Sequence, residues 1–413
     1  MDLILKNISL FVGENLDYVD NGYIVIKNGK IEKVGTGKYK SKSNMNAFEG
    51  RGILVIPGFI NAHTHIGDSI GKDIGVDSAF ESRIHPVHGI KNNILKRTEG
   101  RHLINFMRSS MISMMKKGIV VIADFREGGI HGIEQIKEAT LGLSIRCITL
   151  GRPQHYFDIS RDFDENSKIP HHVMESIHRI LDISDGLGIS GANENTDNSL
   201  NEYRSIIQKR SLKKNYLLGI HSSESAETEK KSINVTGKSE VERITARLLP
   251  NFVVHLTNAS DADIRLVAQK KIGVVVCPRA NATLGVGIPK ISKMINFGCL
   301  VAIGTDNVMI NSPDMFRELD YIWKITRTLE DGTISAREIL KMATVNGGKI
   351  LGINSGSLMA GMSADMIFID KTNLDISPMH DPHVSIVHRA SANSILNVMI
   401  KGKFVDEDEF SCM

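Results

Sequence analysis

Short apolar segments alternate with longer segments of helical character over most of this 413-residue chain. Eight apolar runs of strand length occur in order: Ile53–Ile60, Ile119–Asp124, Ser144–Leu150, Gly186–Gly191, Tyr216–His221, Phe252–Leu256, Gly273–Cys277 and Leu300–Gly304. The segments with helical periodicity include Glu99–Lys117, His131–Thr140, Ile169–Leu181, Leu200–Lys213, Val241–Leu249, Asp261–Lys271 and Pro289–Phe297. Strands that alternate with helices form parallel sheets, because each helix carries the chain back to the start of the next strand. Eight such units over roughly 250 residues predict an α/β protein built on a TIM-like (β/α)8 barrel.

An open, doubly wound sheet is the other fold that such alternation permits. That fold carries a glycine-rich phosphate-binding turn, and the chain lacks one here, which favours the barrel. The fourth strand, Gly186–Gly191, is the weakest assignment because residues 182–198 are rich in Gly, Asn and Asp. Residues 66–98 follow the first strand on the face where barrels place their active sites, and we predict a substrate loop or lid there.

Both ends of the chain have the pattern of short β-strands. Asn21-Gly22 and Asn28-Gly29 separate apolar runs near the N-terminus, and Asn-Gly is the strongest short signal for a hairpin. Residues 364–370 and 397–405 read as strands near the C-terminus. Short strands need partners, so we expect residues 1–55 and 355–413 to form one composite β-domain beside a barrel formed by residues 56–354.

Composition excludes several classes of partner. The chain has 50 basic and 47 acidic residues and a net charge of +3, a balance that argues against nucleic acid or an anionic membrane as partner. No run of eighteen apolar residues predicts a membrane span, and the N-terminus does not read as a secretory signal. The cysteines form no CxxC pair, so we expect free thiols and a cytoplasmic location; they are Cys147, Cys277, Cys299 and Cys412.

A His-x-His pair, His63 and His65, follows the first apolar run. Side chains at positions i and i+2 of a strand point the same way, so both imidazoles can face one point. Imidazole is a common ligand of zinc-like ions. The pair is weak evidence by itself, because two neighbouring surface histidines also arise by chance.

Further polar residues stand at the ends of the other predicted strands. His221 ends the fifth strand, His255 lies at the end of the sixth, and Asp306 follows the eighth, while Glu224 lies three residues beyond His221. Each has an ordinary alternative: a core histidine bonded to backbone, a helix N-cap for Asp306, or a first-turn acid for Glu224. The strand ends of a barrel converge, so one shared metal site explains all of them together.

These residues belong to motifs through which the chain resembles the amidohydrolase superfamily of metal-dependent hydrolases. It is most similar to the aminohydrolase branch, which holds cytosine and guanine deaminases, S-adenosylhomocysteine and methylthioadenosine deaminases, and triazine hydrolases. The motifs are Pro57–His65, His221–Glu224, His255, Cys277–Gly285, Gly304–Asn307, Ala343–Lys349 and Gly361–Asp365. The resemblance implies a (β/α)8 barrel with a small β-sandwich built from both termini.

The resemblance also implies a metal centre. Many superfamily members bind two metals bridged by a carboxylated lysine at the end of strand four, but residues 185–195 contain no lysine. This absence argues for one divalent ion, bound by His63, His65, His221 and Asp306. Three imidazoles and one carboxylate suit Zn²⁺ best, and Fe²⁺ or Mn²⁺ would also be accepted.

The resemblance assigns roles in catalysis. A bound metal ion lowers the pKa of its water from about 15.7 to near 7 and so provides hydroxide. Glu224 is then expected to take a proton from that water and deliver it to a ring nitrogen of the substrate. His255 would orient the water and stabilise developing charge, and Asp306 would help carry a proton to the leaving group.

Substrate contacts are harder to assign. Arg126 and Arg152 end the second and third strands, Asn281 follows the seventh, and His88 lies in the long segment after the first. The basic residues could equally be solvated at the surface, and Asn281 could only fix its own loop. If several basic groups face the pocket, among them Arg83, His85, Lys91 and Arg279, the substrate carries a carboxylate or phosphate.

The expected function is therefore hydrolytic deamination of an aminated heterocycle of purine, pyrimidine, pterin or nucleoside type. The alternative is hydrolysis of a C–Cl, ring-amide, guanidine or formimino C–N bond at the same site. A non-catalytic scaffold is a third hypothesis, but it predicts erosion of a ligand set that is complete here. The expected partner is a small molecule, and a homodimer is the default oligomeric state.

Overall fold

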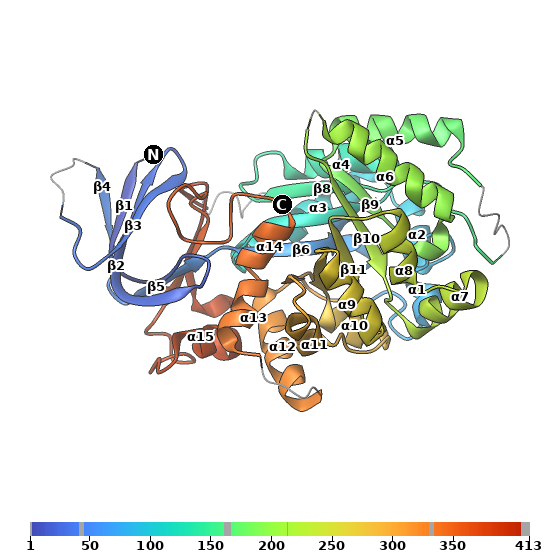
Figure 1. Ribbon diagram of the computed structural model, residues 1–413. Helices are drawn as coiled ribbons and strands as arrows, with labels where there is room; N and C mark the ends of the chain where they lie inside the picture. The colour runs from blue at the N-terminus through green and yellow to red at the C-terminus, as the bar shows by residue number, and fades with distance from the viewer. Residues whose placement is uncertain (1, 41–44, 161–166, 213, 330–333, 406–413) are drawn as a thin grey trace.

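The computed structural model describes residues 2–40, 45–160, 167–212, 214–329 and 334–405, and it confirms the predicted fold class (Figure 1). A parallel barrel sheet surrounded by helices lies beside a separate mixed sheet made from both ends of the chain. Lys213, the last residue of one predicted helix, and Cys412 lie outside the described residues. Within the described ranges, no helix has the length and apolar character needed to cross a bilayer.

The barrel consists of parallel strands that pair in sequence order. They are β6 (Phe59–His65), β7 (Ile119–Arg126), β8 (Arg146–Gly151), β9 (Gly186–Ile189), β10 (Leu217–Ser222), β11 (Phe252–His255), β12 (Gly273–Val276), β13 (Val301–Ile303) and β14 (Asp306–Asn307). β13 pairs with β12, and β14, three residues further along the same pass of chain, pairs with β6. The last pass therefore closes the barrel and brings Asp306 next to Thr64, between the two histidines of β6.

The helices cover the outer face of the barrel and explain the apolar runs of the strands, which are buried on both sides. Helices expected from the sequence are α3 (Gly100–Lys116), α4 (Gly129–Thr140), α5 (His171–Ile183), α6 (Asp197–Ser211), α8 (Glu240–Arg247), α9 (Asp261–Gln269), α11 (Ile291–Asn296) and α14 (Val345–Ile350). Helices that the sequence analysis did not assign are α7 (Ala226–Thr236), α10 (Pro278–Leu284), α12 (Met315–Leu329), α13 (Ala336–Met342) and α15 (Pro382–Val384), with short turns η2 (Ala192–Glu194), η3 (Ser385–Arg389) and η4 (Ala392–Ser394).

The first predicted strand, Ile53–Ile60, is two strands in the structure. β5 (Ile53–Pro57) pairs with strands of the terminal sheet, and β6 starts the barrel two residues later. Gly58 lies between them, and a Cβ at this position would come within 2.5 Å of Val120 Cγ2. The chain thus crosses from one sheet to the other at a glycine, where packing leaves little room for a side chain. The apolar run continues through this point because both sheets bury it.

The terminal sheet joins the two ends of the chain, in the order β17-β16-β15-β5-β1-β2-β3 with β4 paired to β1. Its strands are β1 (Leu3–Val12), β2 (Asp17–Lys27), β3 (Lys30–Thr36), β4 (Asn46–Glu49), β15 (Met366–Asp370), β16 (Ile395–Ile400) and β17 (Lys403–Phe404). The sheet curls over its own core, because the ring of Phe48 on β4 lies 5.7 Å from that of Phe368 and 5.8 Å from that of Phe404.

One of the two predicted Asn-Gly turns is wrong. Asn28-Gly29 does form the turn between β2 and β3, with φ of 48° and 75°. Asn21-Gly22 lies inside β2, where Gly22 is needed because a Cβ there would come within 2.6 Å of Leu10 Cδ2. The glycine at position 22 is therefore explained by close packing between strands, and not by the turn that the sequence pattern predicted.

Residues 66–97, here called the covering segment, follow β6 at the carboxyl end of the barrel. Instead of an irregular loop they form η1 (Ile66–Gly71), α1 (Phe80–Ile84) and α2 (Ile90–Arg97). Several of their side chains line a pocket at that end of the barrel. The position predicted for a substrate loop is thus occupied by short helices.

Candidate metal centre and pocket

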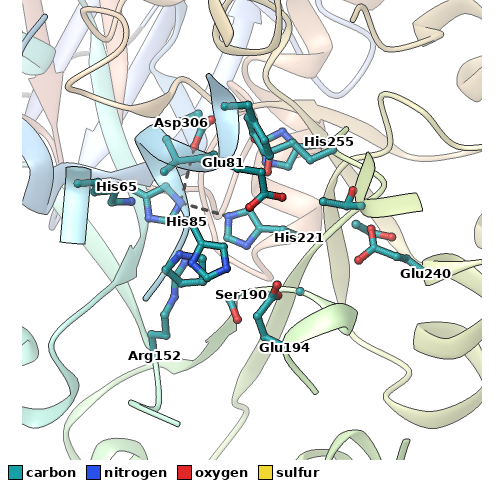
Figure 2. A pocket seen from close by; sticks show the side chains of 18 residues that line it. His65, Glu81, His85, Arg152, Ser190, Glu194, His221, Glu240, His255 and Asp306 are labelled. Atoms are coloured by element: carbon teal, nitrogen blue, oxygen red, sulfur yellow. Dashed lines mark hydrogen bonds and ion pairs between the residues drawn. The ribbon is translucent and has the colours of Figure 1, made fainter. Parts of the chain in front are cut away.

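Three histidines and one aspartate from β6, β10 and β14 converge at the carboxyl end of the barrel, and Figure 2 shows three of the four: His65, His221 and Asp306. His65 Nε2 lies 3.2 Å from His221 Nε2 and 3.6 Å from Asp306 Oδ1, and His63 Nε2 lies 3.4 Å from Asp306 Oδ1. All four side chains are buried. The alternation of the strand places His63 and His65 on the same side of β6, as the sequence predicts.

The imidazoles are oriented by their second nitrogens. His65 Nδ1 faces the carbonyl oxygen of Phe125 at 3.2 Å, and His221 Nδ1 faces that of Ile189 at 3.1 Å. A carbonyl oxygen only accepts, so each Nδ1 carries the hydrogen and each Nε2 turns an unprotonated lone pair to the centre. This arrangement is the one that a metal-binding imidazole requires.

His255 has the opposite orientation. Its Nδ1 accepts a hydrogen bond from the Nδ2 amide group of Asn281 at 3.1 Å, which leaves the ring hydrogen on Nε2. That Nε2 lies 3.5 Å from Glu224 Oε2. His255 therefore presents a hydrogen-bond donor to the pocket, whereas His65 and His221 present lone pairs.

The cluster fits a divalent cation. His63 Nε2 and Asp306 Oδ2 are buried and have no hydrogen-bond partner, a costly state for polar atoms that a bound cation would relieve. One ligand atom from each of His63, His65 and Asp306 lies within 4.8 Å of the others. The same holds for His63, His221 and His255. A nitrogen-rich set with one carboxylate has the chemistry of a zinc site.

Strained backbone marks the same place. His255 and Asp306 have φ of 78° and 59°, and Ser223, next to Glu224, has φ of 51°. Such values cost non-glycine residues about 1–3 kcal/mol each, and they persist where the surrounding structure imposes them, often at functional sites. These residues lie at the ends of β10, β11 and the last barrel pass, beside the cluster.

The charge states of the cluster favour ligation and proton transfer. Burial lowers the pKa of His65 to about 3 and that of His255 to about 4, so both rings are neutral. Burial alone would raise the pKa of Asp306, but the close approach of His63 and the neighbouring histidines brings it well below the usual range. The pKa of Glu224 is raised by burial and by the charges of Asp306 and Glu240. A carboxyl group whose pKa is raised in this way is suited to accept a proton and to release it again.

The predicted substrate contacts occupy different places. Arg152 lines the pocket (Figure 2). Arg126 is buried away from it, with its Nε donating to the carbonyl oxygen of Gly132 at 3.0 Å. Asn281 is also buried and contacts His255 rather than the pocket, and His88 is exposed and stacks on His85, which does line the pocket.

Acidic residues that the sequence analysis did not single out complete the pocket. Figure 2 shows Glu81, Glu194 and Glu240 among the side chains that line the pocket, and Glu224 lines it as well. Glu240 is buried and accepts from the backbone N–H of Ser223 at 2.7 Å, so it holds the loop that carries Glu224. In the sequence Glu240 reads only as a first-turn acid of α8, a position explained by the helix dipole alone.

Two further charged residues, Glu127 and Lys91, lie close to the cluster, and Lys91 also lines the pocket. Glu127, one residue beyond β7, lies 2.8 Å from His65 Nδ1, and Lys91 of the covering segment lies 2.6 Å from Glu127. The sequence analysis noted Lys91 only as one basic residue among several and did not notice Glu127. Its position just after a barrel strand was the available signal.

The chain matches a family model described as the amidohydrolase family over residues 54–405. It is 34% identical over 403 residues to a putative aminohydrolase of Methanothermobacter thermautotrophicus, covering 98% of this chain and 99% of that one. It is 25% identical to a 5'-deoxyadenosine deaminase of Methanococcoides burtonii, covering 100% and 94% of the two chains. A zinc complex of atrazine chlorohydrolase from Arthrobacter aurescens has a similar fold, with a TM-score of 0.84 at 17% identity over 98% and 96% of the chains.

Proposed function

The chain belongs to the amidohydrolase family, and on that premise we propose that it is a metal-dependent hydrolase that deaminates an aminated heterocycle of the purine or nucleoside type. The pairing of Glu224 with His255 beside a buried cluster of metal-ligand type carries the proposal. The similarity to a named 5'-deoxyadenosine deaminase over the whole chain supports the substrate class.

The proposed ligands of one divalent ion, best Zn²⁺, are His63, His65, His221 and Asp306. The inward lone pairs of His65 and His221 and the unpartnered oxygen of Asp306 support this set. His255 is excluded from it because its Nε2 carries hydrogen. When bound, the ion supplies a water whose pKa is lowered to near 7, which makes a nucleophile available at neutral pH.

Glu224 is the proposed proton carrier. Its side chain is 13% exposed and lines the pocket, so its carboxyl group can reach both a water at the centre and a ring nitrogen of a bound heterocycle. Its raised pKa allows it to accept a proton and later donate it. A protonated ring nitrogen makes the adjacent carbon more electrophilic, which is the requirement for displacing ammonia.

His255 and Asp306 complete the proposed machinery. The Nε2–H of His255 can donate a hydrogen bond to the attacking oxygen and stabilise charge that develops on it. Asp306 has one oxygen near His63 and another without a partner, so it can hold the ion and also accept a proton destined for the leaving amine. Asn281 keeps His255 in the tautomer that donates.

An ammonia-release assay on zinc-loaded protein tests the proposal. The substrates are adenosine, 5'-deoxyadenosine, methylthioadenosine, S-adenosylhomocysteine, guanine and cytosine, with a chlorinated triazine as probe of C–Cl hydrolysis. We expect ammonia from at least one aminated purine compound, loss of release after chelation, and recovery on addition of zinc. Chloride release without ammonia release, or no release from any compound, contradicts deamination as the function.

A further inference from the structure

His65 differs from His221 in what lies behind its ring. Each Nδ1 faces a backbone carbonyl oxygen, but only His65 also has a carboxylate there, with Glu127 Oε1 at 2.8 Å. The carbonyl oxygen of Phe125 and the carboxylate of Glu127 are both acceptors. Together they hold hydrogen on Nδ1 and increase the electron density at Nε2, the nitrogen that faces the centre.

Glu127 in turn depends on a cation from the covering segment. Lys91 Nζ on α2 lies 2.6 Å from Glu127 Oε1, whereas Arg152 Nη1 is more distant at 3.8 Å. The side chains of Lys91 and Glu127 are 7% and 13% exposed. A buried carboxylate requires a compensating charge, and Lys91 supplies it from α2 of the covering segment.

The beginning of the covering segment reaches a second proposed ligand. Asp68 on η1 accepts from Asn307 Nδ2 at 2.7 Å and from the backbone N–H of Met309 at 3.0 Å. Asn307 directly follows Asp306, and Lys91 Nζ lies 3.7 Å from Asp68 Oδ2. The covering segment therefore contacts the chain on both sides of the cluster, next to Asp306 and behind His65.

We propose that Glu127 and Lys91 are positioning residues: Glu127 orients His65 for metal binding, and Lys91 neutralises Glu127 while it fastens the covering segment to the barrel. The inference rests on the proposed function only in taking His65 as a metal ligand. It adds that metal affinity and the position of the covering segment depend on one buried ion pair.

Zinc binding by metal-free protein tests the role of Glu127, with zinc alone as probe in competition with a chelator. Replacing a partner of a metal-bound histidine typically weakens metal affinity by about 10–100-fold, so we expect this loss for Glu127→Ala and a smaller one for Glu127→Gln. The matched control is Glu134→Ala, which removes a glutamate whose side chain is 64% exposed. Cobalt-loaded Glu127→Ala should also show an altered visible spectrum, because the geometry around His65 changes.

The outcomes separate this inference from the proposed function. Equal zinc affinity and equal cobalt spectra in Glu127→Ala and the unaltered protein overturn the role of Glu127. Failure of the unaltered protein to bind zinc overturns both, and absence of ammonia release alone affects only the proposed function. Glu127→Gln, which keeps the shape of the side chain, serves if Glu127→Ala does not melt cooperatively.

Amide hydrogen exchange over α2 tests the role of Lys91. Lys91→Met leaves Glu127 without its nearest cation, so exchange in α2 should accelerate by roughly tenfold or more. The matched control is Lys96→Met, the same change at an exposed position of the same helix. In the double variant with Glu127→Gln the acceleration should be smaller than the two single effects combined, because position 127 then carries no charge for Lys91 to neutralise. Additive effects, or equal exchange in Lys91→Met and Lys96→Met, contradict the proposed pairing.

Discussion

The strand ends of the barrel and the covering segment contribute to one pocket in different ways. The strand ends supply buried histidines and Asp306 on a closed sheet whose backbone is fixed by hydrogen bonds on both sides. The covering segment supplies Phe80, Glu81 and His85 from short helices between turns. On the proposed function, the barrel would supply the chemistry, whereas the covering segment would help select what the chemistry acts on.

Loss of a strand-end ligand should have the largest effect. His221→Ala removes an inward-facing lone pair from the centre, so we expect loss of bound zinc and of ammonia release together. Elemental analysis of purified protein measures the first and the ammonia assay the second. His178→Ala, at an exposed position of α5, is the control and should change neither. Full zinc content in His221→Ala would remove His221 from the ligand set.

Glu224→Gln should impair proton transfer without affecting metal binding, although both depend on residues near the strand ends. The amide keeps the shape of the carboxyl group but cannot carry the proton, so turnover should fall by about 10²–10⁴-fold while zinc remains bound. Steady-state kinetics and elemental analysis on one preparation check both parts. Turnover within a few-fold of the unaltered protein would end the proposed role of Glu224.

Asn281 should act through His255 alone. Asn281→Ala removes the hydrogen bond that keeps the ring hydrogen of His255 on Nε2. We therefore expect kcat to fall by roughly 10-fold or more with little change in KM. Asn281→Asp should be at least as damaging, because a carboxylate accepts from Nδ1 and moves the ring hydrogen away from the pocket. An unchanged kcat in both variants would show that Asn281 does not orient His255.

A substitution in the covering segment should have a smaller effect, and the effect should be on KM rather than on kcat. Phe80→Ala removes an aromatic surface from the pocket without touching the cluster, so KM should rise by about 10-fold, the value of a lost ring contact, with kcat and zinc content preserved. Measurement of kcat and KM on the best substrate checks this division. A fall in kcat with unchanged KM would contradict the separation of chemistry from selection.

The barrel and its convergent ligands could be predicted because both depend on local pattern. Strands buried on both faces are apolar throughout, and residues at their carboxyl ends must meet once the sheet closes. His63, His65, His221, His255 and Asp306 are all found at these ends. The same reasoning found Arg152, which follows β8 and lines the pocket.

Features that depend on packing between distant segments could not be predicted in this way. The break at Gly58 is hidden because β5 and β6 are both apolar, although they belong to different sheets. Asn21-Gly22 has the composition of a turn, but its glycine is explained by the close approach of neighbouring strands. Arg126 ends a strand like Arg152, but its guanidinium turns back toward α4 and donates to Gly132.

The metal content of the unaltered protein tests the central claim most directly. Protein stripped with a chelator, loaded with zinc and freed of excess metal should contain one zinc ion per chain by elemental analysis. The account predicts one because His63, His65, His221 and Asp306 form one centre and no lysine follows β9 within residues 185–195. Two ions per chain, or none, would contradict a single-metal centre at the carboxyl end of this barrel.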